Sequence, residues 1–286
     1  PGRSFADEED PIQEPPYALK SRFASDGGAQ EIFDLASGAA PGSSRVVPGE
    51  HALRPPGRSF ADEEDPADAR RLSTTVFTPD NAELNTAVGD WIKDSGDAEA
   101  QYGPISEWDV SKVTDMRGMS YAGVFPASFK FNAPIGAWDT SSVTDMAGAF
   151  LDATTFDQDI GAWDTSSVTD MNHMFNSADA FDQNIGAWDT SKVPSLYSTF
   201  NRAAAFNADI GGWDVSKVKD MKSTFEGATA FNAPIGDWDV SSVTNMLQTF
   251  YGASAFDQAI GGWDVSSVTS MRQTFDTSTA FNADIG

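Results

Sequence analysis

From residue 108 onward, the apolar and polar positions of this chain repeat with a fixed spacing. Trp-Asp begins at Trp108, returns at Trp138, and then recurs every 25 residues up to Trp263, which gives seven units. Counted from each Trp, apolar residues recur at positions 6, 9, 13, 16, 19 and 23. A period of this length is typical of repeat proteins, whose units bury apolar residues only against their neighbours. The pattern therefore predicts a stack of seven units over residues 108–286.

Each unit carries the signals of one short strand and one short helix. Ser-Ser-Val-Thr, or a close variant, precedes position 8 and favours an extended backbone that can pair with its copy in the next unit. Position 8 is Asp, Ser or Asn, which can cap a helix, and Met171, Phe175 and Ala178 then follow with helical spacing. We therefore expect an α/β repeat solenoid, a right-handed coil with one parallel sheet and short helices. Pro194 is the weak point, because it removes a donor from the sheet.

The residues that return in every unit are expected to stack as internal ladders. The late Phe, the Ile before Gly and the leading Trp would lie above their copies, as in Phe156, Phe181 and Phe206. The structural ladder predicted from the Trp-Asp pairs consists of Trp138, Trp163, Trp188, Trp213, Trp238, Trp263, Asp139, Asp164, Asp189, Asp214, Asp239 and Asp264.

Residues 77–107 are expected to form an N-terminal capping helix and the module that leads into the first repeat. Asp80 with Glu83 three residues later is a capping-box signature, and Leu84 and Val88 belong to an apolar helix face. Such a helix would cover the first unit. No counterpart is visible at the other end, so we expect the solenoid of residues 108–286 to be open there.

Residues 1–76 differ from the rest in composition. They are rich in Pro, Gly and acidic residues and lack a periodic apolar pattern, so we expect an extended arm. The string Pro-Gly-Arg-Ser-Phe-Ala-Asp-Glu-Glu-Asp-Pro occurs twice, at 1–11 and 56–66. Two copies could bind two equivalent surfaces of a partner and gain affinity from their linkage, or they could be a duplication without function.

The overall composition excludes several classes of protein. Lys and Arg number 18 against 43 Asp and Glu, and this net charge of −25 argues against nucleic acid as a partner. The absence of Cys excludes disulfides, thiolate metal sites and thiol catalysis. No stretch of eighteen apolar residues occurs, so we expect no transmembrane segment.

The column of Asp residues after each Trp has two interpretations. Parallel neighbours lie about 4.8 Å apart, so the carboxylates would repel one another unless something offsets the charge. A calcium ladder would do so, since carboxylates suit that ion. An Asx-turn, in which each Asp accepts the amide two residues on, would do so without metal. We favour the turn, because the other acids of each unit are inconstant: Asp157 and Asp159 become Asn232 and Pro234. We therefore expect no metal and no cofactor.

Few residues offer catalytic chemistry. Of the two His residues, His51 lies in the expected arm and His173 at an exposed helix position of one repeat, so we expect neither a catalytic triad nor a metal site from them. Possible interaction residues are of two kinds: lysines on the expected strand face, and aromatic residues in the one irregular unit. These residues are Lys112, Lys192, Lys217, Lys219, Tyr121, Phe125 and Phe129.

The run Ile-Gly-x-Trp-Asp-x-Ser-x-Val-Thr-Asp-Met, followed by Phe and Phe-Asn, resembles the repeat of the BspA-like surface-protein family, and the segment before Trp108 resembles its eukaryotic and algal versions. The similarity covers residues 77–286. It implies a leucine-rich-repeat-like solenoid displayed outside the cell, and it implies no reaction.

We therefore expect a non-enzymatic extracellular or cell-surface protein. The first hypothesis is a subunit of a surface filament or layer, such as a flagellar hair or mastigoneme. It would self-associate, or join other extracellular structural proteins, through the N-terminal arm and the solenoid ends. The alternative is a monomeric adhesin or recognition module that binds protein or glycan through the variable strand face. An enzyme is disfavoured, because a catalytic site would interrupt the repeat.

Overall fold

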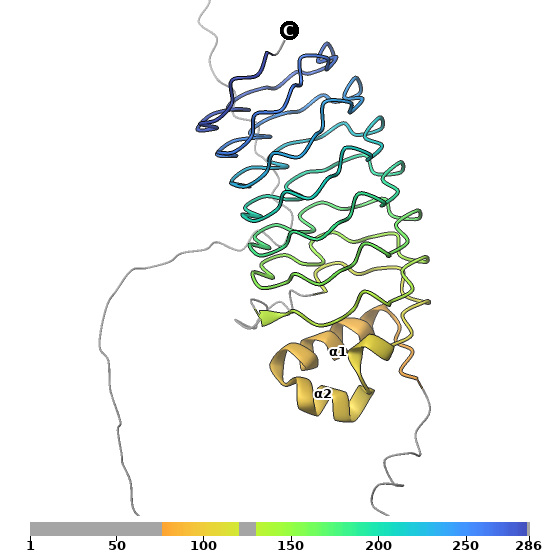
Figure 1. The fold of residues 1–286 in the computed structure, drawn as a ribbon. Coiled ribbons are helices and arrows are strands. Elements are labelled where there is room, and N and C mark those ends of the chain that lie inside the picture. The colour runs from red at the N-terminus through yellow and green to blue at the C-terminus, as the bar shows by residue number, and fades with distance from the viewer. Residues whose placement is uncertain (1–75, 120–129, 285–286) are drawn as a thin grey trace, which may run out of the picture. The chain divides into compact units, whose positions relative to one another are not determined.

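The computed structural model describes residues 76–119 and 130–284, which belong to one compact unit, Glu64–Gly286. Figure 1 shows these residues as a stack of coils with helices at one end. The helices are α1 (Asn81–Lys93), α2 (Ser95–Tyr102) and the 3-10 helix η2 (Ile105–Glu107). The expected arm of residues 1–76 lies outside the described residues except for its last position.

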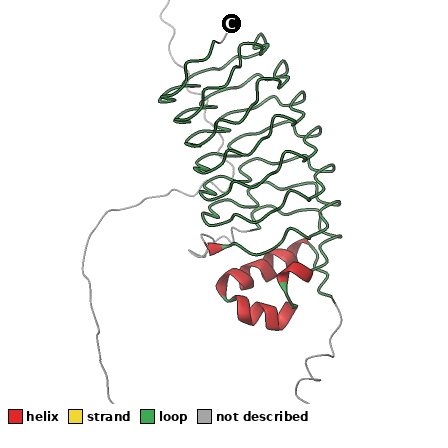
Figure 2. Cartoon of the chain, viewed as in Figure 1, coloured by secondary structure: helices red, strands yellow, loops and turns green. Residues whose placement is uncertain are grey.

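The expected α/β solenoid with a parallel sheet, of the leucine-rich-repeat type, is wrong. In the described ranges, α-helices occur only before the first repeat, and apart from the 3-10 turn at Lys130 the coils consist of turns and loops without a strand (Figure 2). The extended segment of each unit is reduced to a single-residue parallel bridge at position 8. These bridges join Asp115 to Asp145, Asp145 to Asp170, Ser195 to Asp220, Asp220 to Asn245, and Asn245 to Ser270.

The helix expected in each unit is replaced by consecutive turns, and the backbone angles give the reason. In the coil that begins at Trp163, His173 and Ser177 at positions 11 and 15 both have φ of 58°. A left-handed residue cannot continue a right-handed α-helix. The other coils repeat this conformation with the residues Gly118, Gly148, Asp152, Ser198, Arg202, Ser223, Gly227, Gln248, Gly252, Gln273 and Thr277.

The amides of this segment alternate between two kinds of partner. Phe175 and Ser177 donate to the carbonyls of Thr199 and Asn201 in the next coil, at 2.8 and 2.7 Å. The alternate amides, at positions 12, 14 and 16, close local turns within the coil. For example, the Ala178 amide donates to the Phe175 carbonyl at 3.0 Å. The hydrogen-bond pattern therefore has a period of two, and every second bond joins neighbouring coils.

Stacked aromatic rings fill the inside of the coils. The position-13 ladder, which includes Phe175, Phe200 and Phe225, has ring centroids 5.3–5.6 Å apart. The position-19 ladder, which includes Phe181 and Phe206, has spacings of 5.8–6.1 Å. Within one coil the two Phe rings lie only 3.8–4.1 Å apart. Burial of these rings stabilises the stack of coils.

The expected N-terminal helix is confirmed as α1. Asp80 caps it, and its carboxylate accepts from the amide of Glu83, whose own side chain accepts from the Asp80 amide. Leu84 and Val88 are buried in the same core as the coils. The Asn81 side-chain oxygen accepts from the Thr114 amide at 2.9 Å. In the coils, this amide position donates to a carbonyl of the preceding coil, so α1 supplies the acceptor that a preceding coil would offer.

Candidate interaction surface

Each Asp of the Trp-Asp pairs lies in a tight turn at the edge of its coil. In every coil its carboxylate accepts the amide of the Ser two residues on, at 2.9–3.1 Å, as in Asp189 with Ser191. The hydroxyls of Ser141, Ser216 and Ser241 also donate to these carboxylates, at 2.6 Å. This is Asx-turn geometry. Over 76–119 and 130–284, no group of three or more His, Asp or Glu side chains is arranged to hold a metal ion.

The Trp side chains lie inside and bond to the neighbouring coil. The indole N–H of Trp188 donates to the Ile160 carbonyl at 3.2 Å, and Trp138, Trp163, Trp213, Trp238 and Trp263 bond to the equivalent Ile in the same way. Consecutive Trp rings from Trp108 to Trp213 stack 6.1–6.5 Å apart. The Trp of each pair therefore joins neighbouring coils, and the Asp closes a turn within its own coil.

Sequence reasoning missed a second ladder, at position 20. The Asp157 side chain accepts from the Asp182 amide at 3.2 Å, and the Asp182 side chain accepts from the Asn207 amide at 2.8 Å. The ladder runs without a break from Asn132 to Asn282. Its signal was the Asn or Asp that fills this position in every unit, since such side chains accept the amide of the next coil. The acids considered as calcium partners thus include one, Asp157, that holds two coils together.

One surface strip is formed by positions 5 and 7 of the coils. Most coils present Ser and Thr there, and the hydroxyls of Thr144 and Thr169 each donate to a carbonyl of the preceding coil at 3.1 Å. The coil that begins at Trp188 has a lysine at position 5, and the coil that begins at Trp213 has lysines at positions 5 and 7. Lys192, Lys217 and Lys219 are exposed.

A further lysine, Lys222, occupies position 10 of the coil that begins at Trp213, and the equivalent residue of the preceding coil is Tyr197. Lys222 Nζ lies 5.1 Å from the centre of the Tyr197 ring, a cation–π distance. The His173 ring meets the edge of Tyr197 at 4.6 Å. We call Lys192, Lys217, Lys219 and Lys222 the lysine patch. Lys112 lies apart from it, in the first coil, and Tyr121, Phe125 and Phe129 fall outside the described residues.

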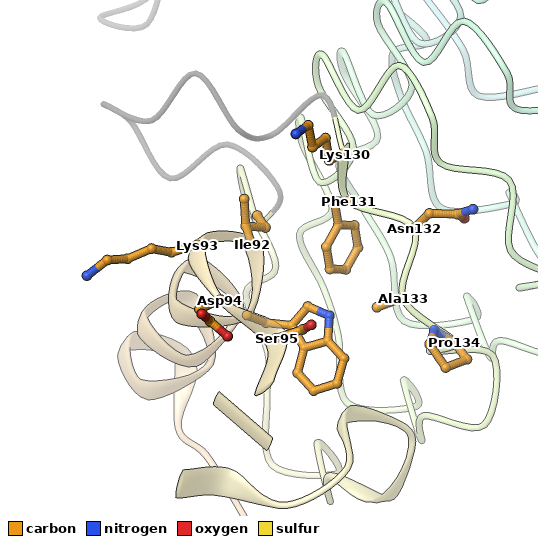
Figure 3. A pocket seen from close by; sticks show the side chains of 10 residues that line it. Ile92, Lys93, Asp94, Ser95, Lys130, Phe131, Asn132, Ala133 and Pro134 are labelled. Atoms are coloured by element: carbon orange, nitrogen blue, oxygen red, sulfur yellow. The ribbon is translucent and has the colours of Figure 1, made fainter. Parts of the chain in front are cut away.

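A cavity of about 490 Å³ lies between the end of α1 and the coil that follows it. Trp91, Ile92 and Phe131 form its apolar walls. In Figure 3, Phe131 and Ala133 line one side, and Lys93 points away from the cavity.

In the part of the chain that the structure describes, no helix is long and apolar enough to cross a membrane.

Comparison with known proteins gives one family. The family model described as "Mycoplasma protein of unknown function, DUF285" matches residues 93–211 and 194–286, which is more than half of the chain. The chain belongs to the DUF285 family. The match begins at the end of α1 and covers every coil, so the 25-residue coil is the structural unit of the DUF285 match here. The chain matches no curated protein and no solved structure.

We expect the stability of the coils to pass through a maximum in mild acid. Hydrogen bonds from the Ser side chains, followed by the Ser amides, lower the pKa of six of the Trp-Asp carboxylates below the usual 3.8. Their contribution is present above about pH 4 and is lost below it. Burial instead raises the pKa of Asp145, Asp152 and Asp179. Their charged forms cost stability at neutral pH, and this cost disappears as the pH falls toward 4.

Urea unfolding between pH 2 and 8 measures this effect. The midpoint should rise from pH 7 toward pH 4 and then fall. Asp152→Asn should raise the midpoint at pH 7 and flatten the rise, because Asn tolerates the left-handed conformation, φ 58°, without a charge. A midpoint that falls steadily from pH 7 downward, in both proteins, contradicts the assignment.

Proposed function

We propose that this protein is a non-enzymatic structural or interaction protein that acts outside the cell, as a subunit of a surface filament or layer. The observation that carries the proposal is that the residues repeated in every unit make contacts between neighbouring coils. Trp, Phe, Ile and the Asn or Asp of position 20 all serve to join one coil to the next. The buried residues are largely the same from coil to coil, whereas the exposed residues vary. This combination is typical of extended repeat proteins that bind partners through their surface.

The extracellular location is supported by the similarity of the repeat to BspA-like surface proteins of the eukaryotic and algal type. DUF285 is the family shown by comparison, and its description assigns no function. Location is therefore tested directly: an antibody against the coils should label intact, unpermeabilised cells. Label that appears only after permeabilisation contradicts an extracellular role.

Assembly is tested by imaging the purified full chain. Negative-stain electron microscopy over a concentration series should show filaments or layers. Deletion of residues 1–76 should abolish them, because the proposal assigns assembly partly to the arm. Thermal unfolding of the deletion variant reports whether the coils remain folded. Dispersed particles at every concentration, in the full chain, would contradict the filament proposal.

The second candidate is a monomeric recognition module that binds protein or glycan. The lysine patch favours it, because four lysines gather on two coils of a chain with a net charge of −25. Protein and glycan arrays probed with the full chain test this candidate. Binding by a chain that remains monomeric would favour recognition over assembly.

A further inference from the structure

The lysine patch concentrates positive charge on one surface of an acidic protein. The Ser195–Asp220 bridge sets these two coils in register, so Lys192 lies beside Lys217, and Lys222 beside Tyr197. Parallel neighbours of this kind are about 4.8 Å apart. Lys192 and Lys217 both act on the Asp189 carboxyl, whose pKa they help to lower after the larger effect of its Ser191 hydrogen bonds.

The patch is not neutralised by ion pairs within the described residues. The salt bridges found there all involve Arg117, with Asp115 at 2.7 Å and Asp145 at 3.4 Å. Asp189 and Asp214 accept the amides of their own turns, and Asp220 accepts the amide of Lys222 at 2.8 Å, so these carboxylates attract the lysines without a direct salt bridge. Adjacent lysines with like charge repel each other, and a bound anionic segment relieves that repulsion.

The same chain carries a sequence of complementary charge in duplicate. Asp-Glu-Glu-Asp occurs at residues 7–10 and again at 62–65, each time preceded by Phe-Ala. Each copy offers four consecutive carboxylates for the four lysines of the patch. An extended peptide has carboxylates on both sides of its backbone, and it can lie across two coils with lysines from each.

We propose that the lysine patch binds the Asp-Glu-Glu-Asp segment of a second copy of this chain. The inference rests on the proposed function and deepens it, since it names one contact through which subunits join. Each molecule then carries one lysine patch and two acidic segments. It can bind one copy through its patch and another copy through an acidic segment. A patch that meets a segment of another molecule is a heterologous contact, which extends into a chain of subunits when it does not close.

The charged groups that would bind are exposed to solvent, so added salt should weaken the binding. Exposed charges are screened over about 8 Å at physiological ionic strength and about 3 Å at 1 M salt. Single ion pairs of this kind are weak, so affinity comes from several pairs together and from the linkage of the two acidic segments. Association should be measurable at low salt and lost near 1 M salt.

A peptide titration tests recognition. The full chain is prepared with all eight carboxylates of the two segments changed to amides, so that they do not compete. Fluorescence anisotropy of a labelled peptide of residues 1–11 should show binding. Combined Lys192→Gln, Lys217→Gln and Lys219→Gln should weaken it by about 10-fold, the sum of three weak exposed pairs. The matched control changes Lys93, Lys112 and Lys130 to Gln and should leave binding unchanged.

Sedimentation velocity of the full chain with intact acidic segments tests the second copy. Association should grow with concentration, and the patch variant, but not the control, should lose it. Equal thermal midpoints of the two variants show that both are folded.

Peptide binding that patch and control variants share equally overturns the inference, even where filaments form. Patch-dependent peptide binding by a chain that stays monomeric overturns the assignment to a second copy. A chain without filaments under any condition counts against the proposed function itself.

Discussion

Phe200→Ala should destabilise the coils by about 3–5 kcal/mol, the usual cost of removing a buried phenylalanine. The Phe200 ring is fully buried and lies 3.9 Å from Phe206, 5.5 Å from Phe175 and 5.6 Å from Phe225, measured between ring centroids. Its loss opens a cavity where two ladders meet. Because neighbouring coils bond to each other at every second amide, they cannot close around the gap. Urea unfolding followed by Trp fluorescence measures the change in free energy of unfolding.

Phe275→Ala is the matched control for this substitution. Phe275 occupies the same position of its coil but is only partly buried, with Phe250 at 5.5 Å and Phe281 at 4.1 Å. It has a ladder neighbour on one side alone among the described residues, so its removal should cost less than half as much. Equal losses for the two variants would show that the ladder does not carry the stability.

Gly186→Ala is expected to have the second large effect, through contact between backbones. A Cβ on Gly186 would lie 2.5 Å from the carbonyl oxygen of Asp209, in the next coil. That oxygen belongs to the backbone and cannot move aside cheaply. Overpacking of this kind costs about 1–3 kcal/mol, and here it would push two coils apart. Thermal and urea unfolding should both show the loss.

Gly262→Ala separates this steric effect from the general effect of changing a glycine. A Cβ at Gly262 would meet nothing within 4 Å. The substitution should be neutral or slightly stabilising, because Ala restricts the unfolded chain more than Gly does. If both variants lose stability equally, the close approach at Gly186 is not the cause.

The sequence alone predicted the period, the residues that face inward and the first helix. Trp, Phe and Ile lie inside the coils because burial of apolar surface does not depend on which local backbone carries them. Asp80 and Glu83 specified α1, since a capping box is a local device and its two bonds form within four residues. The lysines of positions 5 and 7 were likewise assigned to an exposed face and lie on one.

The backbone of positions 8 to 16 was decided only by the tertiary structure. Asp170 accepts the amide of Asn172 at 2.9 Å, a bond that begins an α-helix or a turn equally well. Gly148 and Gly227 take a left-handed conformation that glycine adopts easily, but His173 and Arg202 take the same conformation, each with φ of 58°. What selects the turns is the next coil, whose carbonyls accept the amides of positions 11, 13 and 15. A helix would satisfy these amides within the unit, whereas the stacked turns use them to bind the neighbour, and that choice is invisible in one unit of sequence.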